Sequence, residues 1–353
     1  MVKRSKTYSL LPVFLVIVTI SYPAMGVLIT HSQQDRAIIS IVTTHPVLAS
    51  LIKILGDGGV EVIDLIPPGV NPHEYEPPLD IIRKVGDSDV IIIDALHHLP
   101  ISDRLYSLYS QKTYVLLDEL RKRGWSPQRI PGLNVENLHE VFYDRDALNI
   151  SIDVIKSILT SIAIKKGRGD LAGVFETNSE IVKSIASRSY DTARSRIIVS
   201  GGLVVSLYSP VSYYLLRSIG VNVSIVLTPD PEVEPSPQAI RSLGDLGARC
   251  LLISGDLEHL DLNRLRGSLE PLGVRIIDLK IIPQDPVDLL FIPLEISWDL
   301  VNRCSPTQSA AYNQEREVGL GYTYIAGLVA LAFILGLIIG SILRARRVSH
   351  EGQ

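Results

Sequence analysis

The 353-residue chain has only two cysteines, Cys250 and Cys304, and it has neither a CxxC pair nor a Cys/His cluster. A thiolate metal site is therefore not indicated. Positive charge is not in excess either: the formal net charge is −4, so the composition indicates no basic surface for binding a nucleic acid. The HExxH, GxSxG and P-loop motifs are all absent, and with them the usual hydrolase and nucleotide-binding signatures. We therefore expect neither an enzyme nor a nucleic-acid-binding protein.

The N-terminal 30 residues have the pattern of a secretory signal. Three basic residues within the first six precede an apolar run from Leu10 to Ile20, and small residues follow at 23–26. This order is typical of a signal peptide. An uncleaved signal anchor is the alternative, because no clean cleavage site stands out. We assign residues 1–30 to a signal peptide or anchor.

The C-terminal end has the pattern of a membrane anchor. The apolar run from Ile325 to Leu343 is followed at once by Arg344, Arg346 and Arg347. About 19 apolar residues suffice to cross a bilayer as a helix, and basic residues favour the cytoplasmic side. This predicts a single-pass cell-membrane protein whose main domain is extracellular and whose C-terminus is cytoplasmic. The predicted segments are a tether at 298–322, a transmembrane helix at 323–343 and a cytoplasmic tail at 344–353.

The two cysteines lie in different predicted settings. Cys250 begins an apolar run to Ile253 that is typical of a buried strand, whereas Cys304 lies in the predicted tether. An extracellular location would permit a disulfide. We favour two unrelated thiols and keep the disulfide as the alternative.

Between these ends, short apolar runs alternate with segments of helical periodicity. Continuous apolar strands separated by helices are typical of parallel sheets that are covered on both faces. The sequence therefore predicts an α/β protein with two doubly wound parallel-sheet domains joined by one long helix. We also expect a strand at Arg196–Val199, directly after that helix. The predicted ranges are an N-terminal metal-binding domain at 37–160, the linking helix at 169–194 and a C-terminal domain at 195–297.

One loop stands out as a candidate metal site. Residues 71–78 read NPHEYEPP and follow a strand-like run from Val60 to Ile66. Because proline fixes its own φ and restricts the preceding residue, His73 is held on a stiff backbone at a strand's end. Such pre-organisation suits a metal ligand. A turn that carries an ordinary surface histidine is the alternative.

This loop carries a family resemblance. Together with Thr43-Thr44-His45-Pro46 and Glu234-Pro235-Ser236-Pro237, it resembles the metal-binding receptors of ABC importers for zinc and manganese, and in particular archaeal-type, membrane-anchored members. The likeness runs from about Ile38 to about Ile296. It implies two α/β domains linked by a rigid helix, with the metal bound in the cleft between them and His73 as the first ligand.

The resemblance also implies further ligands. His139 lies in a segment similar to the second ligand motif of the family, although Leu138 stands where that motif has proline. Glu140 or Asp144 would then orient its imidazole. His98 matches a His-x-Pro of archaeal-type receptors and follows a buried strand, which favours it over His97. Both can equally be surface residues.

The second domain departs from the family pattern. Ser209 falls where the family places a histidine or glutamate, and a neutral hydroxyl is a poor ligand for a first-row metal. Asp278 is the best positional match for the last ligand, with Asp285 behind it, although an acid at a strand's end is often a turn former. His45 is expected to line the cleft. We read Ser236 as a helix N-cap without chemistry.

These observations lead to one main hypothesis. Imidazoles with one carboxylate suit zinc best and manganese second, so we expect Zn²⁺, or alternatively Mn²⁺, as the transported ligand of a receptor that serves an ABC importer permease. The metal ligands would be His73, His139, His98 and Asp278. The alternative is a surface adhesion or interaction protein on the same fold with a degenerate metal site. A metallohydrolase with Glu74 as its base is the enzyme alternative.

Overall fold

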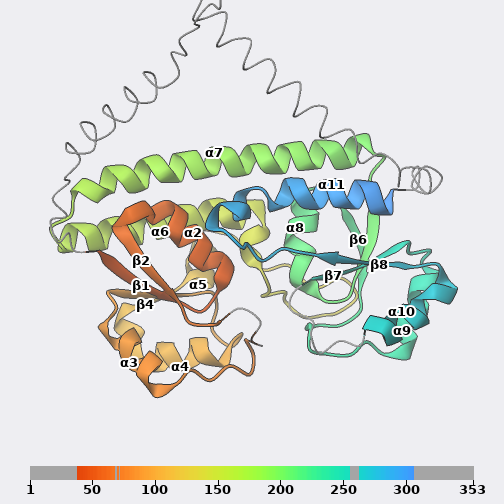
Figure 1. The fold of residues 1–353 in the computed structure, drawn as a ribbon, viewed down its shortest axis with the longest axis horizontal. Helices are drawn as coiled ribbons and strands as arrows, with labels where there is room; N and C mark the ends of the chain where they lie inside the picture. The colour runs from red at the N-terminus through yellow and green to blue at the C-terminus, as the bar shows by residue number, and fades with distance from the viewer. Residues whose placement is uncertain (1–37, 68–69, 71, 255–261, 306–353) are drawn as a thin grey trace, which may run out of the picture. The chain divides into compact units, whose positions relative to one another are not determined.

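The structure, a computed structural model, describes residues 38–67, 70, 72–254 and 262–305, and the residues from Ile39 onward belong to one compact unit. It contains two four-stranded sheets whose strands are all parallel (Figure 1). The first has the strand order β2-β1-β3-β4 and the second β6-β5-β7-β8, so both have the same connectivity. We call residues 39–165 the first lobe and residues 204–304 the second lobe. The two parallel sheets expected from the sequence are therefore present. The strands are β1 (Ile39–Thr43), β2 (Val60–Asp64), β3 (Val90–Ile93), β4 (Thr113–Val115), β5 (Val204–Leu207), β6 (Asn222–Val226), β7 (Cys250–Ser254) and β8 (Arg275–Leu279).

Helices cover both faces of each sheet, which explains the continuous apolar strands. In β3, Val90 and Ile92 face one core cluster, and Ile91 and Ile93 face another. A strand with apolar neighbours on both sides needs no polar face. The helices of the first lobe are α2 (Pro46–Gly56), α3 (Leu79–Asp87), α4 (Pro100–Tyr109), α5 (Leu116–Lys122) and α6 (Arg145–Lys165); those of the second are α8 (Tyr213–Ser218), α9 (Pro237–Asp245), α10 (Leu262–Leu269) and α11 (Ile292–Cys304). Short 3₁₀ segments are η1 (Asp57–Gly59), η2 (Ser110–Lys112), η3 (Val141–Tyr143), η4 (Pro210–Ser212), η5 (Glu270–Leu272) and η6 (Pro286–Leu290).

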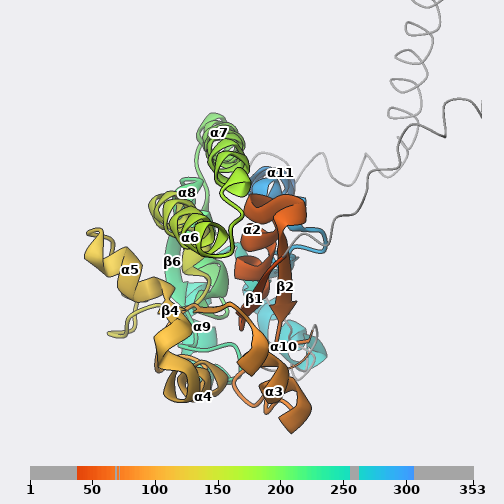
Figure 2. The same ribbon diagram turned by 90° about the vertical axis from the view of Figure 1, so that its left-hand side faces the viewer.

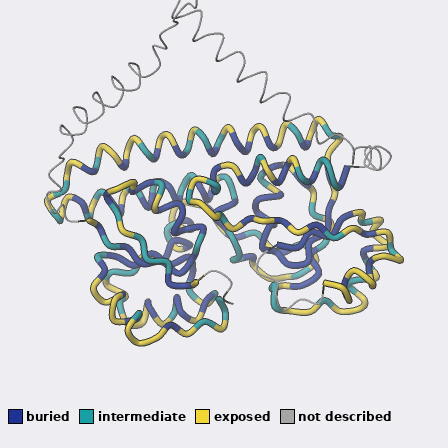
Figure 3. The backbone as a smooth tube through the Cα atoms, in the orientation of Figure 1, coloured by how far each residue is buried: buried dark blue, intermediate teal, exposed yellow. Residues whose placement is uncertain are grey.

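The long helix α7 (Asp170–Val199) runs along both lobes and packs against α6, α2 and α11 (Figures 1 and 2). Its buried residues recur at helical spacing, and its other side is exposed (Figure 3). The expected strand at Arg196–Val199 is wrong, because these residues form the last turns of α7. Ile197 is fully buried on the helix's inner face, whereas Val199 is 86% exposed. The helix ends before Gly201 and Gly202, which both have positive φ.

The predicted start of the tether at residue 298 is also wrong. Residues 298–304 continue α11, which packs against α7 and buries Leu300 and Cys304. Cys304 is disulfide-bonded to Cys250 at the start of β7, so the expectation of two unrelated thiols is wrong too. Both errors have one cause: α11 brings Cys304 back over the second sheet, and the local sequence does not show this long-range contact.

Helix starts follow the expected capping chemistry. Ser236 accepts a hydrogen bond from the backbone N–H of Ala239, with Pro237 in the first turn of α9, so its predicted capping role is confirmed. Asp144 caps α6 in the same way through the N–H groups of Asp146 and Ala147.

Among the residues that the structure describes, one helix, α6, is long and apolar enough to cross a membrane by those two criteria. Half of its apolar stretch is buried, and it packs against α7, α2 and α5, as a core helix does. The predicted signal segment, transmembrane helix and cytoplasmic tail lie outside the described residues.

Candidate metal site

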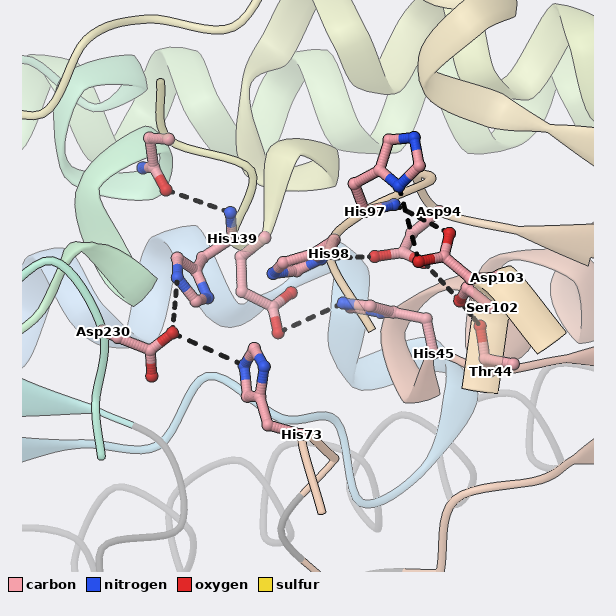
Figure 4. A network of polar contacts seen from close by, with 12 residues as sticks. Thr44, His45, His73, Asp94, His97, His98, Ser102, Asp103, His139 and Asp230 are labelled. Carbon is pink, nitrogen blue, oxygen red and sulfur yellow. Dashed lines mark hydrogen bonds and ion pairs between the residues drawn. The ribbon is translucent and has the colours of Figure 1, made fainter. Parts of the chain in front are cut away.

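The candidate site lies where loops leave the carboxyl ends of parallel strands, the usual ligand position in open α/β sheets. His73 follows β2, and His98 follows β3. His139 precedes η3, and Asp230 lies in the loop between β6 and α9 of the second lobe. Figure 4 shows these four side chains pointing toward one another. The site therefore draws on three loops of the first lobe and one of the second.

Three imidazoles form the centre of the site. His73, His98 and His139 each offer one ring nitrogen, and these three nitrogens lie within 4.8 Å of one another. The ring centroids are 4.9 Å apart for His98 and His139, 5.6 Å for His73 and His98, and 6.1 Å for His73 and His139. Three converging nitrogen donors are a typical protein ligand set for zinc.

His98 is oriented by a buried carboxylate. Its Nδ1 lies 2.7 Å from Oδ2 of Asp94, while Ser102 donates a hydrogen bond of 3.2 Å to Oδ1 of the same group. Burial works to lower the pKa of His98, but the hydrogen bond to Asp94 and the charges of Asp94, Glu140 and Asp230 outweigh it and raise that pKa. Burial works to raise the pKa of Asp94, and the bond and charge of His98 lower it to about 2. Asp94 is therefore an anion that fixes the imidazole.

The other nitrogen of His98 is the one that faces the cluster. Nε2 is buried and has no hydrogen-bond partner within the described part of the chain. A buried polar atom without a partner costs free energy. A metal ion bound by this nitrogen would remove that cost.

His139 is held by contacts that cross between the lobes. Its backbone N–H donates to Oδ1 of Asn137 at 3.0 Å, and Nδ2 of Asn137 donates to the carbonyl oxygen of Pro210 at 3.2 Å. The hydroxyl of Tyr214 donates to the Asn137 carbonyl at 2.8 Å. Burial, and then repulsion from protonated His98 and His73, lower the pKa of His139 to about 3. His139 is thus neutral at physiological pH and keeps a lone pair for a metal.

Asp230 supplies the carboxylate of the second lobe. Its Oδ2 lies 3.6 Å from Nε2 of His73 and 3.8 Å from Nε2 of His139. Burial lowers the pKa of His73, an effect that the negative charge of Asp230 partly offsets. The arrangement places one carboxylate beside the imidazole nitrogens, a combination of donors that suits a divalent transition metal.

A second pair lies beside this cluster. His45 is buried and the side chain of Glu140 is 11% exposed, with 3.6 Å between Nε2 and Oε1. Burial raises the pKa of Glu140, and the nearby His45 and His98 partly offset that effect. The expectation that Glu140 or Asp144 orients His139 is wrong, because Glu140 faces His45 and Asp144 caps α6.

A family model described as "ZnuA: Zinc-uptake complex component A periplasmic" matches residues 41–249, more than half of the chain. The chain belongs to this family. The ZnuA family is a class of transport components, not of enzymes.

Individual relatives match over shorter stretches. The manganese ABC transporter substrate-binding lipoprotein PsaA of Streptococcus pneumoniae is 29% identical over 68 residues, which cover 19% of this chain and 22% of that protein. A metal ABC transporter substrate-binding lipoprotein of Lactococcus lactis is 35% identical over 69 residues, 19% of this chain and 21% of that protein. The matched region thus spans about a fifth of the length of these curated relatives.

Solved structures share the fold over most of the described chain. A zinc-bound ZnuA deletion mutant has a TM-score of 0.62 at 15% identity and covers 76% of this chain and 99% of its own. The periplasmic zinc-binding protein TroA of Treponema pallidum has a TM-score of 0.61 at 17% identity, with the same coverage. At such identities the likeness concerns the fold alone.

The structure brings together three of the four ligands that the sequence suggested for a ZnuA-family site. His73, His98 and His139 converge, whereas Asp278 does not join them. Asp278 lies within β8 between the buried Ile277 and Leu279, so strand alternation turns its side chain outward, where it is exposed.

Two further positions differ from their expected roles. Ser209 is buried just before η4, and its hydroxyl has no hydrogen-bond partner among the described residues. His97 has a positive φ of 60°, and its side chain is 89% exposed and faces Asp103. The preference for His98 over His97 thus agrees with the direction of the two side chains.

Asp230 was not among the ligands predicted from the sequence. Its segment, Thr228-Pro229-Asp230-Pro231, follows the carboxyl end of β6, so the strand-end rule that singled out His73 also applied here. The nearby Glu234-Pro235 was instead interpreted only as the approach to a helix start. Acids between prolines are so often turn formers that the pattern alone did not stand out.

Proposed function

We propose that this chain is an extracytoplasmic receptor that captures a divalent transition metal and presents it to the permease of an ABC importer. Zinc is the first candidate and manganese the second. The observation that carries the proposal is the convergence of three ring nitrogens, from His73, His98 and His139, within 4.8 Å. The ligand set then consists of these imidazoles together with Asp230, in place of the expected Asp278.

The electrostatics support cation capture. Metal ions bind neutral imidazole, and burial lowers the pKa of both His73 and His139. Asp230 adds one negative charge from the second lobe. An ion held by both lobes would join them, which is how a receptor can present a loaded state to a transporter.

We further propose that the receptor is held at the outer face of the cell membrane. The apolar run 325–343 would serve as the anchor, with the arginines after it in the cytoplasm. The relatives named above are lipoproteins, so a protein anchor would replace a lipid in the same task. Resistance of the full chain to carbonate extraction from membranes tests this part.

The test of metal capture is zinc and manganese titration of the purified full-length chain by calorimetry, together with metal analysis. We expect one zinc per chain, and affinity lowered by more than about 100-fold in His73→Ala and His98→Asn. His97→Asn is the matched control, because it alters the adjacent histidine, whose side chain is exposed, and asparagine tolerates positive φ. Equal losses in His97→Asn and His98→Asn would contradict the assignment.

One observation favours a second candidate, a surface interaction protein that has lost its metal. Ser209 is a weak donor at a position where the resemblance implied a ligand. Absence of zinc and manganese binding by the folded wild-type chain would favour this candidate. Stoichiometric binding would exclude it.

A further inference from the structure

A second group of ligand atoms overlaps the imidazole cluster. His73, Asp230 and Glu232 each offer one atom, and these atoms lie within 4.8 Å of one another. All three residues are half-buried. The two groups share His73, but the second replaces two imidazoles by two carboxylates.

The loop that carries both carboxylates is fixed at the end of the second sheet. The hydroxyl of Thr228 lies 2.8 Å from the carbonyl oxygen of Tyr208 and 3.0 Å from that of Asp230, within donating distance of both. The backbone N–H of Glu232 donates to Oδ1 of Asp230 at 3.3 Å, and Val233 N–H donates to the Asp230 carbonyl. Oδ2 of Asp230 therefore remains on the side of His73. The carboxylates are held in place before any ion arrives.

Glu232 carries an independent sign of a cation. Its Oε2 atom is buried and has no hydrogen-bond partner among the described residues. A carboxylate oxygen that is removed from water without a partner is costly. A cation between Glu232, Asp230 and His73 would satisfy this oxygen.

The two groups differ in the metal that they favour. Imidazole nitrogens suit zinc, whereas carboxylate oxygens and water suit manganese, which accepts octahedral coordination. We propose that His73, Asp230 and Glu232 form an alternative, oxygen-rich ligand set for Mn²⁺, while His73, His98 and His139, together with Asp230, hold Zn²⁺. Because both sets need His73, the chain binds one ion at a time. This inference rests on the proposed receptor function and names the ligands of its second metal.

The test compares Mn²⁺ and Zn²⁺ titrations of the full-length chain with those of Glu232→Gln. We expect Glu232→Gln to weaken Mn²⁺ binding by about tenfold or more and to change Zn²⁺ binding by less than about twofold. Glu234→Gln, which neutralises an exposed carboxylate two residues away, should change neither affinity. His98→Asn should show the reverse pattern, with the larger loss for Zn²⁺. Glu232→Asp, which keeps a carboxylate, should retain more Mn²⁺ affinity than Glu232→Gln.

A separate experiment tests whether Zn²⁺ and Mn²⁺ compete for His73. One equivalent of Zn²⁺ should release bound Mn²⁺, which the electron paramagnetic resonance signal of free Mn²⁺ reports. A chain that holds both ions at once would overturn the sharing. Equal changes for the two metals in folded Glu232→Gln, or no change for either, would overturn the inference and leave the receptor function intact. Absence of binding of either metal by the wild-type chain would instead overturn the receptor function itself.

Discussion

Nδ1 of His98 lies 2.7 Å from Oδ2 of Asp94, and both side chains are buried. This contact fixes which ring nitrogen faces the imidazole cluster, since the bonded Nδ1 leaves only Nε2 free to bind an ion. Asp94 itself is held by Ser102, which in turn lies 3.0 Å from the hydroxyl of Thr44. Thr44, Ser102 and Asp94 thus form a series of polar contacts that holds the His98 imidazole in place.

Replacing Asp94 by asparagine should weaken metal binding without removing a ligand. We expect zinc affinity to fall by about 10- to 100-fold, because the neutral amide no longer orients or polarises His98. Calorimetric titration measures the change, and circular dichroism checks the fold. Asp103→Asn is the control, because Asp103 faces the exposed His97. Loss of affinity in both variants would show that the loop, and not the Asp94 contact, is responsible.

Zinc affinity should fall as the pH is lowered. In the proposed site zinc would bind neutral His98, whose pKa is raised above 6.5, so protons should begin to compete at or above that pH. His139, with a pKa of about 3, stays neutral and adds no competition in this range. We expect a plateau at alkaline pH and a loss of about tenfold per pH unit below the pKa of His98. Competition with a chromophoric chelator across this range measures the profile. In Asp94→Asn the fall should move to lower pH, and an unchanged profile would contradict the role of Asp94.

Tyr214 should matter for both stability and the site. Its hydroxyl accepts from the backbone N–H of Gln128 and donates to the carbonyl of Asn137, both at 2.8 Å. Tyr214→Phe leaves these two groups unpaired, which should lower the free energy of unfolding by about 1–3 kcal/mol. Urea denaturation measures this loss. Tyr213→Phe is the control, since no hydrogen bond of the neighbouring Tyr213 hydroxyl is found in the described residues. Zinc affinity should also fall in Tyr214→Phe, because Asn137 holds His139.

Reduction of the Cys250–Cys304 disulfide should destabilise the second lobe. The bond closes a loop with a sequence separation of 54 residues, and chain entropy assigns a closure of this length about 4 kcal/mol. We expect a lower melting temperature under reducing conditions and in a Cys250→Ser, Cys304→Ser double variant. Zinc stoichiometry should persist, since neither cysteine lies in a ligand group found among the described residues. An unchanged melting temperature would show that α11 is held by packing alone.

Local pattern was sufficient for much of the fold. The apolar run at Val90–Ile93 predicted a strand covered on both faces, which the two core clusters around it confirm. The apolar pattern gave the wrong element at Arg196–Val199, because β-branched residues in a short apolar run fit a strand as well as the end of a helix. Only the packing of Ile197 against the core distinguishes the two.

The site was predictable where the chain itself fixes the geometry. His73 and His98 lie in the loops that follow β2 and β3, so the strand-end rule located them. Asp230 was missed because its partners, His73 and His139, are remote in sequence. Asp278 was chosen by alignment with a ligand position, but the alternation of β8 turns it away from the cluster. The buried neighbours Ile277 and Leu279 fix that alternation, because a shift of the strand by one residue would turn them outward and Asp278 into the core.

The long helix α7 contacts helices of both lobes, and a single apolar cluster extends from Ile41 in β1 through Phe175 in α7 to Leu252 in β7. Two sheets with similar topology would ordinarily suggest two modules that can be separated by gene truncation. Here, removal of either sheet would strip the apolar cover from its neighbour. We therefore expect the pair of sheets, and not either sheet alone, to fold and melt as one cooperative body.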